Sequence, residues 1–97
     1  MQCNLMFTYI LSDFGNKHMS DIATKLGPEW RRLAVRLGVD FKKIDEIEAK
    51  YSSDQEYAAY VMLLQWRDDP DTSMEQKRQD LLRALQKMNR PDIQDLV

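Results

Sequence analysis

Helical segments separated by glycine and proline make up the chain from residue 20 onward. All three glycines and all three prolines of the 97-residue chain lie between apolar-periodic segments or at their starts. Glycine favours the ends of helices, and proline is tolerated only in the first helical turn. No segment shows the apolar–polar alternation of a half-buried strand. The positions of glycine and proline therefore predict a bundle of short helices.

The periodic segments predict six helices, over residues 20–27, 28–38, 41–51, 56–66, 74–88 and 92–97. Ser20, Asp40 and either Thr72 or Ser73 stand where N-caps are expected, and residues 52–54 form a further turn and cap. Because the links are short, consecutive helices should run in opposite directions. The expected fold is a compact all-α antiparallel bundle.

Apolar spacing within each segment predicts which residues form the core. The face of segment 28–38 consists of Trp30, Leu33, Ala34 and Leu37. In the next segment either Phe41 or Ile44 points inward together with Ile47, and in segment 74–88 either Leu81 or Leu82 does so. Segment 56–66 is apolar on most sides and ends in Trp66, so it should be the central helix.

Residues 1–19 are interpreted as an N-terminal extension or linker, followed by one domain over residues 20–97. The apolar run at 5–11 is expected to be a helix or strand that packs on the domain, or the remnant of a preceding region, and residues 14–19 are expected to be a joint. This run is too short for a membrane span and lacks a basic leader. We therefore expect no membrane insertion and no signal peptide.

The balance of residue types disfavours several function classes. The chain has 14 basic and 16 acidic residues and a net charge of −2, which gives no general attraction to nucleic acid or anionic membrane. Its single cysteine and single histidine, Cys3 and His18, supply neither a disulfide framework nor a zinc site. Phosphate-binding loops and hydrolase motifs are absent from the sequence. We therefore predict no enzyme activity, no metal and no cofactor.

A helix-turn-helix DNA-binding domain is the alternative interpretation. Ala34, Gly38 and Ile44 have the spacing of that motif within LAVRLGVDFKKIDEIEAKY, residues 33–51. The recognition helix would then be 41–51, which carries three lysines and three acids and no arginine, asparagine or glutamine to read bases. We therefore favour a packing role, in which a small residue and a glycine let two helices cross closely, and no binding of nucleic acid.

Four stretches of the chain resemble the death-domain family, and most of all the death domains of Fas-associated adaptors. These are WRRLA (30–34), KIDEIEAKY (43–51), LQWRDDPDT (64–72) and LLRALQKMNRPDIQDLV (81–97). The resemblance covers residues 20–97 and implies a six-helix antiparallel Greek-key bundle without catalysis. It also implies a cytoplasmic adaptor that binds other death domains in apoptotic or innate-immune, caspase-activating complexes. A caspase-recruitment domain, with a kinked first helix, is a related alternative.

Charged surfaces are the expected binding sites for a partner death domain or for a second copy of the chain. The segment 28–38 carries three arginines, and the turn at 68–71 carries three aspartates. Opposite charges on different faces would allow head-to-tail association. The resemblance adds charged positions 43 and 45, and it places Val35 where the related adaptors carry a partner-binding arginine. The predicted partner-binding residues are Arg31, Arg32, Val35, Arg36, Lys43, Asp45, Asp68, Asp69 and Asp71.

Overall fold

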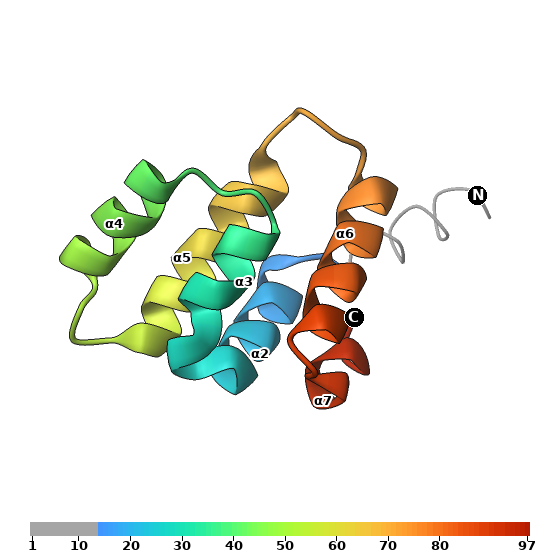
Figure 1. Ribbon diagram of the computed structural model, residues 1–97, viewed down its shortest axis with the longest axis horizontal. Helices are drawn as coiled ribbons and strands as arrows, with labels where there is room; N and C mark the ends of the chain where they lie inside the picture. The colour runs from blue at the N-terminus through green and yellow to red at the C-terminus, as the bar shows by residue number, and fades with distance from the viewer. Residues whose placement is uncertain (1–13) are drawn as a thin grey trace.

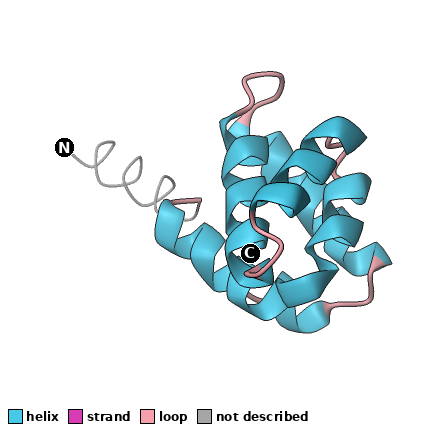
Figure 2. Cartoon of the chain, turned by 90° about the vertical axis from the view of Figure 1, so that its left-hand side faces the viewer, coloured by secondary structure: helices cyan, strands magenta, loops and turns pink. Residues whose placement is uncertain are grey.

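The computed structural model describes residues 14–97, which form helices joined by short turns (Figure 1). The elements are α2 (Asn16–Leu26), the 3-10 helix η1 (Gly27–Glu29), α3 (Trp30–Arg36), α4 (Phe41–Lys50), α5 (Gln55–Asp68), α6 (Met74–Lys87) and α7 (Pro91–Gln94). This part of the chain contains no strand (Figure 2), which confirms the all-α class. The predicted segment 28–38 therefore begins as a 3-10 turn, and the predicted helix 92–97 is a single turn that begins at Pro91.

The first described helix begins earlier than the sequence pattern predicts. Residues 14–19 were expected to be a joint with Ser20 as the cap, but α2 begins at Asn16 after an extended Gly15. Ser20 lies on the exposed side of this helix, whereas Phe14 is buried in the core. The reason is an apolar stripe with helical spacing that starts before residue 20, at Met19, Ile22, Ala23 and Leu26. The expectations for residues 5–11 and for Cys3 lie outside the described residues.

Side-chain caps begin three of the other helices, as predicted. Asp40, Asp54 and Ser73 each accept a hydrogen bond from a backbone N–H two or three residues further on, at 3.2, 3.0 and 3.1 Å. The cap of α6 is therefore Ser73 and not Thr72. Each cap satisfies a donor that the first helical turn leaves without a partner.

Backbone turns with a left-handed residue end α3 and α6. At the end of α3, Gly38 has φ 82°, its N–H donates to the carbonyl of Val35, and the N–H of Val39 donates to that of Ala34. Asn89 has φ 59° in the same arrangement after α6. This is the Schellman ending, which favours glycine or asparagine. Open space surrounds the place where a Cβ of Gly38 would lie, so the expected role of this glycine in a close helix crossing is wrong.

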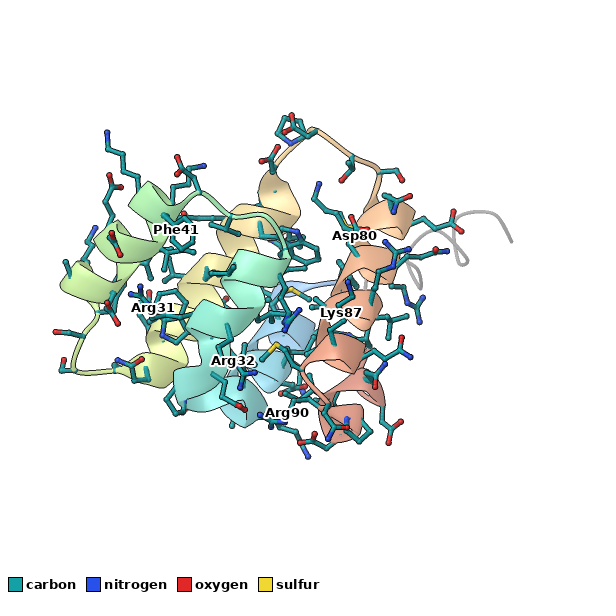
Figure 3. The ribbon with its side chains drawn as sticks, viewed as in Figure 1. Arg31, Arg32, Phe41, Asp80, Lys87 and Arg90 are labelled. Atoms are coloured by element: carbon teal, nitrogen blue, oxygen red, sulfur yellow. The ribbon has the colours of Figure 1, made fainter. Side chains whose placement is uncertain are left out.

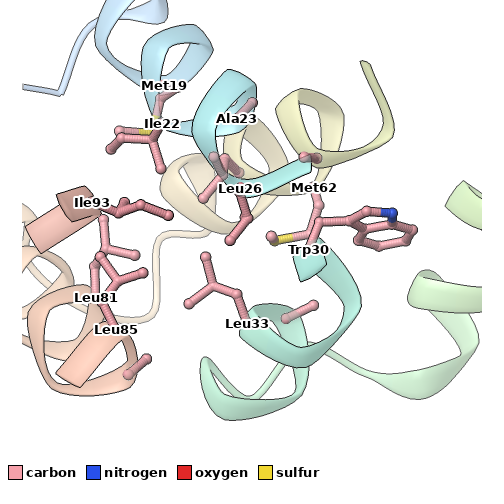
Figure 4. Packing of buried hydrophobic residues seen from close by; sticks show 14 of the residues in the cluster. Met19, Ile22, Ala23, Leu26, Trp30, Leu33, Met62, Leu81, Leu85 and Ile93 are labelled. Atoms are coloured by element: carbon pink, nitrogen blue, oxygen red, sulfur yellow. The ribbon is translucent and has the colours of Figure 1, made fainter. Parts of the chain in front are cut away.

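Helix α5 is the centre of the bundle and packs against α2, η1, α3 and α4. Around it, Trp30, Leu33 and the other core side chains interlock (Figure 4), and Trp30 Nε1 donates to Gln55 Oε1 at 2.8 Å. Of the paired alternatives, Ile44 and Leu81 are buried. Leu37 and Trp66 are only partly buried against this core. None of the helices in residues 14–97 combines the length and the apolar character that a membrane span requires.

Candidate interaction surfaces

The three arginines of α3 point in two directions. Arg32 and Arg36 are four residues apart and share one side of the helix, while Arg31 shares another side with Val35. In Figure 3, Arg31 lies on the α4 side of α3 and Arg32 lies away from α4. The basic helix that the sequence predicts as one group therefore contributes to two different surfaces.

Arg31 is held between two carboxylates of α4. Its guanidinium lies 3.5 Å from Asp45 and also forms an ion pair and hydrogen bond with Glu48. The planar fork of an arginine suits such a double contact. Two residues predicted to bind a partner, Arg31 and Asp45, thus neutralise each other across the α3–α4 boundary. Because these side chains remain partly exposed, we expect the Arg31–Asp45 ion pair to add no more than about 1 kcal/mol to the free energy of unfolding.

Two exposed apolar side chains lie beside this ion-pair cluster. Val35 is 46% exposed and Phe41 is 63% exposed. Arg31, near the start of α3, pairs with Glu48, near the end of α4, and Figure 1 shows the two helices running in roughly opposite directions. Val35, one turn after Arg31, is therefore on the side of Phe41, which is one turn before Asp45. We define the α3–α4 surface as Arg31, Val35, Phe41, Asp45 and Glu48.

Phe41 is the functional candidate that sequence reasoning missed. The pattern allowed either Phe41 or Ile44 to face the core, and Ile44 is fully buried. A core position filled by Ile44 leaves Phe41 on the outer side of α4, where Asp45 follows one turn later. The sequence pattern therefore named Phe41 as one of two candidates for the core, but it did not show that Phe41 would be the exposed one.

Arg32 and Arg36 belong to a more positive region. Arg32 lies 3.6 Å from Glu29, which also pairs with Arg90. Arg36 forms no ion pair within residues 14–97 and lines a hollow of about 280 Å³ between the end of α3 and α6. We define the basic hollow by its three cationic side chains, Arg36, Arg83 and Lys87.

A buried lysine holds the turn that joins α5 to α6. Lys77 is 3% exposed, and its ammonium donates to the Asp69 and Thr72 carbonyls and to the Thr72 hydroxyl. Asp68 pairs with Arg67 at 2.9 Å, and Asp69 accepts from the N–H of Asp71 at 3.0 Å. Asp69 and Asp71 form no ion pair within residues 14–97, and we call them the acidic turn.

A second hollow, of about 320 Å³, lies between the acidic turn and the α3–α4 turn. Lys43 lines this hollow, so it lies near Asp69 and Asp71 and away from the cluster around Arg31. The basic hollow and this second hollow share Leu37, Gly38 and Asp80. Arg36 lines the basic hollow, whereas Asp69 and Asp71 line the second hollow, so the predicted basic and acidic residues belong to separate hollows.

Arg90 joins the α6–α7 turn to the start of the bundle. It pairs with Glu29, donates to the Lys25 carbonyl at 3.0 Å, and forms two hydrogen bonds with Asp92. The hydrogen bond from Arg90 holds the pKa of Asp92 below its ordinary value, and the same bond raises the pKa of Arg90. These contacts give Arg90 a structural role, which is to hold the α6–α7 turn against the start of the bundle.

Comparison with protein families finds one match. The model of the family described as "Death domain" matches residues 16–97, a range that begins at the first residue of α2. Comparisons with curated proteins and with solved structures find no match.

Proposed function

This chain belongs to the death-domain family, and from this premise we propose that it is an adaptor module that binds another death domain through its α3–α4 surface. Members of the family are protein-interaction modules and not enzymes. We propose a partner that is a receptor or adaptor of apoptotic or innate-immune signalling, and a cytoplasmic site of action. The resemblance of residues 30–34 and 43–51 to Fas-associated adaptors supports this choice.

One observation carries the proposal: two exposed apolar side chains, Val35 and Phe41, each lie one helical turn from a member of a charged cluster. Val35 and Phe41 can be buried by a partner without moving the bundle, because neither belongs to its core. Interfaces commonly combine an apolar centre with a polar rim, and arginine and aromatic residues contribute much of their binding energy. Arg31, Asp45 and Glu48 would then set orientation and exclude wrong partners.

Val35 indicates which kind of partner death domain fits. Where Fas-associated adaptors have a partner-binding arginine, this chain has a half-exposed aliphatic side chain. An acidic partner residue facing Val35 would lose its water without gaining an ion pair. We therefore expect the partner to present an apolar side chain at this point, and a Fas-type receptor to bind weakly.

Substitutions on the α3–α4 surface test the proposal. The wild-type domain is passed over immobilised death domains of receptors and adaptors, and binding is compared with that of Val35→Asp and Phe41→Asp. We expect the wild type to bind at least one of them and each variant to bind it at least about tenfold more weakly. The matched control is Met74→Asp, which replaces an apolar side chain of similar exposure on α6.

Circular dichroism should show the same helical content for all variants, because each substituted side chain is exposed. Unchanged binding by both surface variants, or no binding of the wild type to any death domain, would contradict the proposal. A titration with duplex DNA at low salt separates the alternative function. A DNA-binding domain would bind there with an affinity that falls as salt is added, whereas we expect no binding.

A further inference from the structure

Most serine and threonine hydroxyls of residues 14–97 either form hydrogen bonds within the fold or lie inside a helix. The hydroxyl of Thr24 donates to the carbonyl of Ser20 at 3.0 Å, and Ser20 itself lies in the middle of α2. Around the α5–α6 turn, the Thr72 hydroxyl accepts from the Lys77 ammonium at 3.2 Å, and the Ser73 hydroxyl caps α6. These hydroxyls have structural roles or are fixed in helical backbone.

The turn between α4 and α5 carries two hydroxyls of a different kind. Ser52 and Ser53 are both exposed there, and neither hydroxyl forms a hydrogen bond within the described part of the chain. Ser52 takes part only through its carbonyl, which accepts from Gln55 Nε2 at 3.1 Å. Figure 1 shows that the link between α4 and α5 runs along the edge of the bundle. An enzyme can therefore approach these hydroxyls without displacing a core side chain.

The acidic residues that follow this turn distinguish Ser53 from Ser52. Exposed carboxylates stand one and three residues after Ser53, at Asp54 and Glu56, whereas the third residue after Ser52 is Gln55. Charge complementarity orients a binding partner, so acids at these positions suit an enzyme whose substrate cleft is basic. Of the hydroxyls in residues 14–97, only that of Ser53 combines exposure, freedom from hydrogen bonds and this pattern of acids.

The segment around Ser53 can open while the bundle stays folded. Its turn is closed by the N–H of Asp54, which donates to the Tyr51 carbonyl at 3.0 Å, and by the Asp54 carboxylate, which accepts from the N–H of Tyr57 at 3.0 Å. These bonds lie at the exposed end of a helix, where local opening costs much less free energy than global unfolding. None of the side chains at 52–56 belongs to the hydrophobic core.

We propose that Ser53 is a phosphorylation site for a serine kinase that prefers acidic substrates and uses ATP. In the transfer, Ser53 Oγ bonds to the γ-phosphorus, the bond from that phosphorus to the β–γ bridging oxygen breaks, ADP leaves, and the hydroxyl proton passes to a base of the kinase. The phosphate would add a charge of about −1.5 to −2 beside Asp54 and Glu56. These carboxylates line a hollow of about 420 Å³ together with Tyr57 and Tyr60, so phosphorylation would make this hollow more attractive to cationic groups.

The test is phosphorylation of the whole chain by such a kinase with ATP, with the modified residue located by mass spectrometry. We expect phosphate at Ser53, none at this turn in Ser53→Ala, and an unchanged rate for Ser52→Ala. Glu56→Gln removes the charge but keeps an oxygen that can accept from the Thr24 hydroxyl, and it should slow the reaction at least about tenfold. The matched control is Glu75→Gln, which removes the acid three residues after Thr72 and should leave the rate at Ser53 unchanged.

Circular dichroism should show the same helical content for the wild type and all four variants, because each substituted side chain is exposed. Phosphate at Thr72 or Ser73 in place of Ser53, a rate that Glu56→Gln does not change, or a wild-type chain that takes up no phosphate at Ser53 would overturn the proposal. Ser53 is not part of the α3–α4 surface, and the assay contains no death-domain partner. Failure of this proposal is therefore distinguishable from failure of the proposed binding function.

Discussion

At the scale of single residues, Lys77 has the most demanding surroundings. It is the one charged side chain among the buried residues of the described chain, and its ammonium has three acceptors for its three protons. A buried charge without such partners costs several kcal/mol. These hydrogen bonds therefore compensate the burial of the Lys77 ammonium, and they also connect α6 to the turn before it.

Replacing Lys77 with methionine keeps most of the volume and removes the three hydrogen bonds. We expect Lys77→Met to lower the free energy of unfolding by about 1–3 kcal/mol, because the carbonyls of Asp69 and Thr72 lose the donor that holds the turn. Urea denaturation measures this. Lys87→Met, an exposed substitution on the same helix, should change stability by less than about 0.5 kcal/mol. Equal effects of the two substitutions would show that Lys77 does not hold the turn.

A pH dependence follows from the Arg90–Asp92 contact. The pKa of Asp92 is lowered from 3.8 in the folded state, so the contact stabilises the fold above pH 3.8 and is lost as the pH falls through the folded pKa. We expect Asp92→Asn to be less stable than the wild type above pH 3.8, and the difference to disappear in stronger acid. Urea midpoints measured across this range test it, and a difference that does not change with pH would contradict it.

At the scale of elements, the endings of α3 and α6 use different residues for one geometry. Gly38 adopts φ 82° without strain, whereas Asn89 adopts φ 59° at some cost. The space around Gly38 is open, so a methyl group added there would be disfavoured by the backbone alone. The pair offers a test of the backbone effect with little change in packing.

We expect Gly38→Ala to lower the free energy of unfolding by about 1 kcal/mol and Asn89→Gly to leave it unchanged or raise it slightly. Thermal denaturation of both variants measures this effect. The opposite order of stabilities would mean that these positions act through side-chain contacts, and it would contradict the assignment of both turns.

Local signals explain which elements could be predicted. The caps at Asp40, Asp54 and Ser73 depend on residues only two or three positions away, and the buried stripe around Trp30 depends on helical period alone. The start of α2 was missed because Gly15 and the polar residues 16–18 resemble a joint. Met19 reveals the helix only when it is read together with Ile22 and Leu26.

At the scale of the whole molecule, contacts between helices decide the site. That α3 is basic could be predicted, but the pairing of Arg31 with Asp45 and Glu48 depends on how α3 crosses α4. The position of Arg36 beside Lys87 depends likewise on how α6 packs on α3. No local sequence pattern contains these contacts between helices. They divide the three arginines of α3, which the sequence predicts as one patch, between two surfaces.

Lys77 is an intermediate case. It lies one turn before Leu81 on the buried side of α6, so the stripe of that helix extends to it. A lysine in such a position signals that the preceding turn supplies its acceptors, which is what the contacts with Asp69 and Thr72 provide.

The most direct test of the central claim maps the binding surface by NMR. The isotope-labelled domain is titrated with the tightest-binding death domain of the panel, and amide shifts are followed for residues 14–97. We predict that the largest changes fall on the α3–α4 surface, at Arg31, Val35, Phe41, Asp45 and Glu48. Changes confined to α6 and α7, with that surface unaffected, would contradict the account.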